Sequence, residues 1–215
     1  MNQAQTRLLE HLWEQYPQLL PQKQNLLDAF SLLCVCFSTQ HKVLTCGNGG
    51  SAADSEHIVG ELMKGFLLKR PLDRDQIRSL RAAGCGEPEQ FAAGLQQGLP
   101  AISLVSQSAL MTAFLNDVQP DMVFAQQAFA YGCPGDVLLA LSTSGNSANV
   151  VNAALAAKAK GMEIIAFTGE RESRLSAVSS VTFRVPAAET YRIQEYHLPL
   201  YHALCGLTEL ELFRE

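Results

Sequence analysis

Apolar positions follow two alternating patterns along this chain. Continuous apolar runs, typical of strands buried on both faces of a sheet, occur at 42–45, 101–105, 137–141, 162–168 and 181–185. Elsewhere apolar residues recur every three or four positions, which predicts helices at 3–16, 23–38, from the turn at 47–51 to about 66, up to 117, and at 122–131, 148–160, 173–178 and 190–212. This alternation predicts an α/β fold: a five-stranded parallel sheet flanked by helices, with N-terminal helices and a long C-terminal helix.

The length of 215 residues suits a single domain spanning 1–215. Residues 1–40 form an amphipathic helical arm, which is expected to pack either on the core or on another subunit. Residues 67–99 interrupt the alternation and carry nine charged residues of mixed sign between Lys69 and Glu89. They hold too few apolar residues for a core of their own, so we expect a surface insertion of helical turns, including a short helix near 91–95.

Composition narrows the class of protein. Hydrophobic residues make up 47% of the chain and the net charge is −5, which indicates a globular protein without a broad nucleic-acid surface. No apolar run approaches the length of a membrane span, and the polar N-terminus does not resemble a signal peptide. The six cysteines form no CxxC pair. We therefore expect reduced thiols and a cytoplasmic location.

A glycine turn follows the first predicted strand, with the sequence Cys46-Gly47-Asn48-Gly49-Gly50-Ser51. Glycine lets the backbone approach a ligand closely, and Ser51 lies at the start of a helix, where free N–H groups attract anions. The spacing Gly-x-Gly-Gly differs from the dinucleotide fingerprint, and no acidic residue follows at the position that would hold a ribose. The turn therefore favours a small phosphorylated ligand.

A second loop, Ser142-Thr143-Ser144-Gly145-Asn146-Ser147, follows the third predicted strand. One hydroxyl is enough to cap the helix behind it, and four hydroxyls in six residues exceed that need. Hydroxyl and N–H donors match the oxygens of a phosphate. Both loops end parallel strands, so they are expected on the same rim of the sheet.

Two further segments carry candidate chemistry. His57 and Glu61 lie four residues apart on one helix face, where they can act in proton transfer or hold a divalent metal. The last helix carries many polar groups, and Pro199 within it is expected to kink it. Gln194 and His202 lie about 12 Å apart along a straight helix. If both bind one metal, either the helix bends or one of them serves a neighbouring subunit.

These motifs together resemble the SIS (sugar isomerase) domain family, and most closely its phosphoheptose isomerase branch. The resemblance runs from about residue 25 to the C-terminus, apart from 67–99. It rests on the glycine turn, the His57/Glu61 pair, the serine-rich loop, and two further features: Asn116-Asp117, and Arg192-Ile193-Gln194-Glu195 with His197 and His202.

The resemblance implies isomerisation of sedoheptulose 7-phosphate to D-glycero-D-manno-heptose 7-phosphate through an enediol, as in lipopolysaccharide heptose biosynthesis. Glu61 would be the base and His202 the acid. Zinc would be held by His57, Glu61, Gln194 and His202. The substrate would be bound by Asn48, Gly49, Gly50, Ser51, Glu61, Asn116, Asp117, Ser142, Thr143, Ser144, Ser147 and Gln194. The family further implies a homotetramer with shared sites, without nucleic-acid or membrane partners.

An alternative class stays open at this point. Some SIS proteins are not catalytic: one binds the replication initiator DnaA as a tetrameric scaffold, and others sense phosphosugars. Glu61 and His202 are both present here, which favours an enzyme. The chain departs from the isomerase pattern in the long insertion at 67–99 and at Tyr191, and both departures bear on which phosphosugar is bound.

Overall fold

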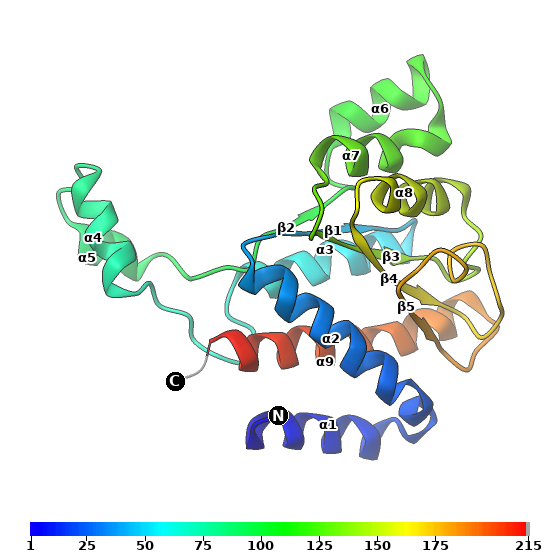
Figure 1. The fold of residues 1–215 in the computed structure, drawn as a ribbon, viewed down its shortest axis with the longest axis horizontal. Helices are drawn as coiled ribbons and strands as arrows, with labels where there is room; N and C mark the ends of the chain where they lie inside the picture. The colour runs from blue at the N-terminus through cyan, green and yellow to red at the C-terminus, as the bar shows by residue number, and fades with distance from the viewer. Residues whose placement is uncertain (214–215) are drawn as a thin grey trace.

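The computed structural model describes residues 1–213, and in this part of the chain a five-stranded parallel sheet forms the centre of the molecule (Figure 1). The strand order is β2-β1-β3-β4-β5, and every neighbouring pair is parallel. The strands are β1 (Val43–Cys46), β2 (Ala101–Ser103), β3 (Val137–Leu141), β4 (Glu163–Thr168) and β5 (Val181–Arg184). The predicted sheet is confirmed, although β2 ends two residues earlier than expected.

Helices cover both faces of the sheet, which explains why the strands are continuous apolar runs. Along β3, Val137, Leu139 and Leu141 face one apolar cluster, while Leu138 and Ala140 face another. The first cluster is covered by α1 (Gln3–Gln15), η1 (Pro17–Gln22), α2 (Lys23–Ser38), α3 (Gly50–Met63) and α9 (Thr190–Leu212). The second is covered by α6 (Ser108–Asp117), α7 (Val123–Tyr131) and α8 (Ala148–Ala159), with η2 (Pro120–Met122) between α6 and α7.

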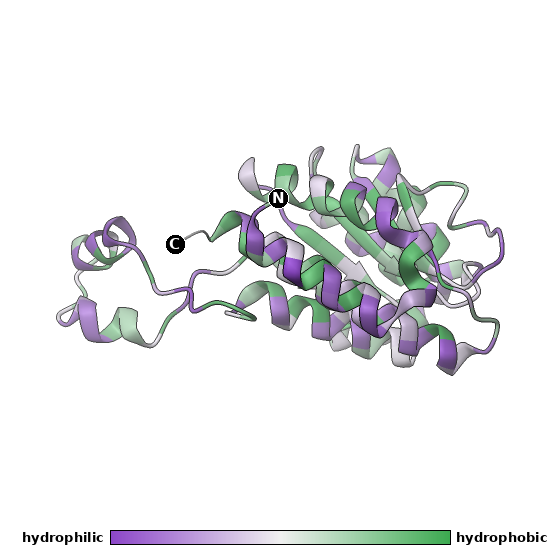
Figure 2. Ribbon diagram, turned by 90° about the horizontal axis from the view of Figure 1, so that it is seen from below, coloured by the Kyte–Doolittle hydropathy of each residue, from purple (hydrophilic) through white to green (hydrophobic). Residues whose placement is uncertain are grey.

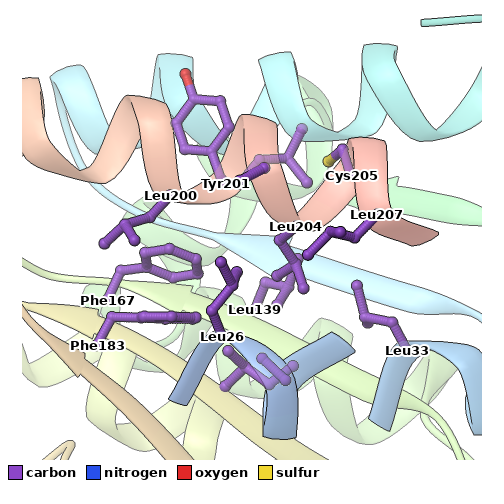
Figure 3. Close-up of a cluster of buried hydrophobic side chains, with 14 of the residues drawn as sticks. Leu26, Leu33, Leu139, Phe167, Phe183, Leu200, Tyr201, Leu204, Cys205 and Leu207 are labelled. Carbon is purple, nitrogen blue, oxygen red and sulfur yellow. The ribbon is translucent and has the colours of Figure 1, made fainter. Parts of the chain in front are cut away.

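The long C-terminal helix α9 organises the first layer. Figure 3 shows Leu200 of this helix above the stacked rings of Phe167 and Phe183, whose centroids lie 4.6 Å apart, with Leu204 further along the helix. The N-terminal helices α1 and α2 also pack on α9, so the apolar face of the helical arm is covered within the chain. Among residues 1–213, no helix combines the length and apolar character that crossing a bilayer requires.

The insertion, residues 67–99, leaves the body after α3 and returns to it at β2. It contains α4 (Arg74–Ala82) and α5 (Pro88–Ala93), which project away from the sheet (Figures 1 and 2). Helix α4 buries none of its side chains and contacts α5. The insertion begins shortly after α3, the helix that carries His57 and Glu61, and it therefore lies close in sequence to these two candidate site residues.

One predicted helix is wrong. Residues 174–178 form turns rather than a helix, although Ser173 and Ser176 exchange the side-chain-to-backbone bonds of a capping box. Helix α3 also ends at Met63, three residues before the predicted end.

A buried ion pair joins the end of α3 to α9. Arg70 Nε lies 2.6 Å from Glu209 Oε1, and the two side chains are 1% and 0% exposed. Arg70 also donates to the carbonyl oxygens of Glu61 and Leu62, the last turn of α3. Glu209 accepts backbone N–H groups from residues 66–68 as well. Both charged groups are therefore held by several hydrogen bonds in addition to each other.

Replacing Arg70 with alanine is expected to destabilise the fold strongly. The change leaves the Glu209 carboxylate buried without its cation, which typically costs about 3–5 kcal/mol. Urea unfolding of Arg70→Ala measures this loss. The control is Arg78→Ala, because Arg78 pairs with Asp75 on the exposed surface of α4, and such pairs contribute less than about 1 kcal/mol. Equal stability of the two variants would contradict the role given to the buried pair.

Candidate functional site

The glycine turn and the serine-rich loop lie side by side at the carboxyl edge of the sheet. They follow β1 and β3, which are neighbours in the sheet. From β1 the chain crosses to β2 on one side, whereas from β3 it crosses to β4 on the other. Ligands of open parallel sheets bind at such a reversal of strand order. The two loops therefore lie on the same rim of the sheet, as expected.

The glycine turn needs glycine at two positions. Gly49 has a φ of 57°, which side chains with a Cβ rarely adopt. A Cβ on Gly47 would lie 2.4 Å from the carbonyl oxygen of Ser51. Helix α3 begins directly behind the turn, and no side chain caps its first N–H groups. Uncapped N–H groups at a helix start are available to an anion.

The serine-rich loop leads into α8 in the same way. Ser147 stands at the N-cap position but makes no side-chain capping bond. Its Oγ instead accepts a hydrogen bond from Ser142 Oγ at 3.0 Å. Capping therefore does not account for these hydroxyls. Reciprocal side-chain amide bonds between Asn48 and Asn149, at 2.9 and 2.8 Å, tie the glycine turn to the start of α8.

Between the two loops lies a cavity of about 260 Å³. It is lined by Asn48, Gly49, Gly50, Ser51, Leu141, Ser142, Thr143, Ser147, Thr190 and Gln194. No described lysine or arginine lines it, so an anion here is held by helix N-termini and hydroxyl groups. We call it the anion cavity. Thr190, at the start of α9, and Leu141, at the end of β3, are the members that the sequence analysis missed.

A second group of side chains gathers where α3 packs against α9. His57 Nε2 lies 3.2 Å from Glu61 Oε1 and 3.5 Å from His202 Nε2. The ring of Phe66 lies 5.5 Å from the ring of His202. Burial lowers the pKa of His202 below its usual range; the neighbouring His57 lowers it further, and Glu61 acts in the opposite direction. We call His57, Glu61 and His202 the acid–base cluster.

Two residues outside the predicted set support this cluster. The Tyr201 hydroxyl lies 3.0 Å from His57 Nδ1 and donates to Asp54 Oδ1 at 3.1 Å. It points away from the apolar cluster and toward α3 (Figure 3). Burial raises the pKa of Asp54, although the bond from Tyr201 opposes that shift. Asp54 lies three residues before His57, on the same face of α3, and that spacing is the signal in the sequence by which it could have been found.

The anion cavity and the acid–base cluster lie at two positions along the paired helices α3 and α9, and we call the two together the elongated site. Gly50 faces Gln194 at one end, and His57 faces His202 at the other. Seven residues separate the two positions on α3 and eight on α9. At 1.5 Å per residue, these separations correspond to about 10–12 Å along the paired helices.

Some predicted site residues do not join this arrangement. Asn116 and Asp117 are exposed at the end of α6 and bond to each other at 2.7 Å. Ser144 lines a separate cavity of about 280 Å³ with Asn146 and Arg171. Gln194 lies at the anion cavity, away from the other three predicted metal ligands. These positions depend on long-range packing, which sequence spacing does not specify.

The metal site stays a prediction. Across residues 1–213, no group of three or more His, Cys, Asp or Glu side chains is arranged as a ready metal site. Ligand atoms around tetrahedral zinc, at bond lengths of about 2.0–2.1 Å, lie roughly 3.4 Å apart. The two contacts of His57 Nε2 in the acid–base cluster, at 3.2 and 3.5 Å, match that separation. These two separations are compatible with shared zinc ligands, so zinc remains a proposal, and Gln194 of the same chain lies at the anion cavity instead.

Helix α9 runs without interruption from Thr190 to Leu212, with Pro199 inside it. This continuity keeps Gln194 and His202 at the two ends of the elongated site.

Comparison with known proteins gives a consistent result. The profile of the SIS domain family matches residues 6–90 and 91–169. The phosphoheptose isomerase of Shewanella baltica is 37% identical over 193 residues, covering 88% of this chain and 85% of that protein. That of Burkholderia mallei is 38% identical over 196 residues, covering 91% of this chain and 84% of that protein.

Solved structures agree with the sequence comparison. The phosphoheptose isomerase of Neisseria gonorrhoeae superposes with a TM-score of 0.70 and 32% identity, covering 95% of this chain and 99% of that one. That of Francisella tularensis gives a TM-score of 0.70 and 26% identity, covering 93% and 97%. The NanR protein of Vibrio vulnificus, solved in complex with ManNAc-6P, is 14% identical with a TM-score of 0.55 and shares the fold alone.

Substituting Gly50 tests the anion cavity. A Cβ there would lie 2.7 Å from Gln194 Nε2, and this flexible side chain would have to leave its place. Gly50→Ala should therefore weaken binding of a sugar phosphate by about tenfold, equivalent to about 1.4 kcal/mol, while thermal stability changes little. Isothermal titration calorimetry measures the affinity.

The matched control is Gly60→Ala on the same helix, because a Cβ at Gly60 meets nothing within 4 Å. It should keep the affinity and stabilise the helix by about 0.5–1 kcal/mol. Unchanged affinity in Gly50→Ala would contradict the assignment of the cavity.

Proposed function

The chain belongs to the SIS domain family and to its phosphoheptose isomerase branch, and from this premise we propose that it isomerises sedoheptulose 7-phosphate to a heptose 7-phosphate. The observation that carries the proposal is the elongated site, with an anion cavity at one end and an acid–base cluster at the other. A seven-carbon sugar holds its phosphate and its carbonyl at opposite ends. The separation of about 10–12 Å along α3 and α9 suits a substrate of that length.

The phosphate is held at the anion cavity by the two helix starts and the serine hydroxyls. Binding there fixes the far end of the sugar at the acid–base cluster, where remote binding energy aligns the reacting carbons. Asn48, Ser51, Thr143 and Gln194 line the same cavity and are proposed substrate contacts. The proposed substrate contacts also include Asn116, Asp117 and Ser144. They reach the substrate through a movement of the chain or from a neighbouring subunit.

Glu61 is the proposed base. It removes a proton from C1 of the ketose while the carbonyl oxygen O2 gains a proton, which leaves an enediol across C1 and C2. A proton then arrives at C2 and the hydroxyl proton on O1 is lost, so that C1 becomes the aldehyde carbon. His202 is the proposed acid, because it approaches the same point from α9. Each group of this kind typically contributes about 10²–10⁴-fold in rate.

Zinc is the proposed cofactor, held by His57, Glu61 and His202. When bound, it would polarise the sugar's oxygen atoms and stabilise negative charge on the enediol. The protein itself supplies three ligand side chains, with His57 Nε2 between Glu61 and His202. A fourth donor from Gln194 would have to come from a neighbouring copy, because Gln194 of the same chain lies beside Gly50.

We therefore also propose a homotetramer with shared sites, acting in the cytoplasm on the heptose of lipopolysaccharide. Helix α6 supports an interface, since it buries none of its side chains within the chain although Leu115 and other apolar residues lie on it.

Changing the base tests the reaction. Glu61→Gln keeps the shape of the side chain but cannot accept a proton, so kcat should fall by about 10²–10⁴-fold while KM changes little. Turnover is followed by exchange of the C1 proton with heavy water, using five-, six- and seven-carbon ketose phosphates. The control is Glu56→Gln on the exposed side of α3, whose carboxylate accepts a bond from Ser106.

Sedoheptulose 7-phosphate should exchange fastest with the unaltered protein and with the control. Wild-type rates in Glu61→Gln would exclude it as the base. Phosphosugar binding without exchange for any ketose would instead favour the non-catalytic class.

Subunit mixing tests the shared site. Glu61→Gln and Gln194→Ala homo-oligomers should each be nearly inactive. If Gln194 serves a neighbouring subunit, mixed oligomers regain activity, because some sites then combine Glu61 of one subunit with Gln194 of the other. Light scattering should give the mass of a tetramer, and a fully active monomer would contradict the proposal.

A further inference from the structure

Tyr201 connects the acid–base cluster to a buried carboxylate. Its side chain is fully buried, and its hydroxyl is shared between His57 and Asp54. The other carboxylate oxygen of Asp54, Oδ2, is buried without a hydrogen-bond partner. The chain Asp54–Tyr201–His57 therefore begins at a buried carboxylate and ends at the histidine whose other nitrogen faces Glu61 and His202.

The direction of these hydrogen bonds follows from counting protons. A tyrosine hydroxyl carries one proton, and an ionised carboxylate can only accept. Tyr201 therefore gives its proton to Asp54 and must accept one from His57. That bond places the proton of the neutral His57 ring on Nδ1 and leaves a lone pair on Nε2.

In this tautomer Glu61 offers no hydrogen-bond donor to the lone pair on Nε2. Glu61 Oε1, at 3.2 Å, is also an acceptor. Two acceptors at this separation repel unless a cation lies between them or the ring gains a second proton. The opposite tautomer would remove the conflict, because Nε2–H would then donate directly to Glu61. In that tautomer His57 and Glu61 satisfy each other, and the His57 nitrogen that faces the cluster offers no free electron pair to a metal.

We propose that Tyr201 is a positioning residue, held by Asp54, that keeps His57 in the Nδ1–H tautomer and so keeps Nε2 open for a divalent cation shared with Glu61 and His202; this rests on the proposed function. A hydrogen bond to the distal nitrogen of a ligating histidine fixes both its tautomer and its orientation. Here the bond comes from a tyrosine, with the carboxylate one step further out.

Two variants act on different links of this chain. Tyr201→Phe removes the hydroxyl, so His57 is free to take the tautomer that bonds to Glu61. Asp54→Asn keeps the shape of the side chain but supplies an amide donor. The Tyr201 hydroxyl can then accept from that amide and donate to His57, which reverses the direction of the chain. Both changes should favour the closed His57–Glu61 pair.

The measurement is the affinity of the purified protein for Zn²⁺, by competition with a chromophoric chelator. Tyr201→Phe and Asp54→Asn should each weaken binding by about 10–100-fold, as other changes behind a ligating histidine do. The loss of kcat should be reversed by raising the Zn²⁺ concentration, while KM for the phosphosugar stays close to the original value. Tyr196→Phe is the matched control, because its ring lies on the same helix beside Arg192.

A second readout does not depend on the metal. The ¹⁵N shifts of the His57 ring in the zinc-free protein report which nitrogen carries the proton. They should show Nδ1–H in the original protein and a shift toward Nε2–H in both variants.

The outcomes separate this inference from the proposed function. Unchanged zinc affinity in Tyr201→Phe, or absence of zinc binding by the original protein, overturns the inference even if isomerisation is observed. Unchanged affinity in Asp54→Asn shows that the carboxylate does not set the direction, and also overturns it. Weakened zinc binding in both variants without any isomerase activity supports the inference and rejects the proposed reaction.

Discussion

The buried ion pair between Arg70 and Glu209 sets the relation between the two helices that carry the acid–base cluster. Arg70 binds the carbonyl groups of the last turn of α3, the turn that holds Glu61. Glu209 lies seven residues after His202 on α9, about two turns along the helix. Moving α3 along α9 would break the ion pair and leave buried charges unpaired, so the spacing of Glu61 and His202 is closely constrained.

The two ends of the elongated site use different physics. At the anion cavity the donors are backbone N–H groups and hydroxyls, which keep their character at any pH at which the protein is folded. At the other end the groups titrate, and their state depends on burial and on each other, as the lowered pKa of His202 shows. Phosphate binding thus relies on groups that are insensitive to pH, whereas proton transfer relies on groups that titrate. Helices α3 and α9 contribute to both.

Local signals in the sequence were sufficient for the sheet and for placing the two loops on one rim. The glycine turn requires glycine for steric reasons at Gly47 and Gly49, and its neighbours in the chain make the helix start. The helix predicted at 173–178 is wrong: residues 174–178 form turns, although Ser173 and Ser176 make the bonds of a helix start. The roles around Tyr201 were beyond prediction, because a hydrogen bond across 144 residues depends on how α9 lies against α3.

The proposed double use of Glu61, as base and as metal ligand, is consistent only if its two oxygens have separate tasks. In the structure they already differ: Oε1 faces His57, while Oε2 lies 3.2 Å from the ammonium group of the exposed Lys64. A pair with an exposed lysine is weak, so a substrate can displace the lysine from Oε2. Oε1 then belongs to the histidine side of the site and Oε2 to the substrate. The hydrogen-bond direction imposed through Tyr201 serves the same division, because without a proton on His57 Nε2 the Oε1 side of Glu61 is left to the proposed cation.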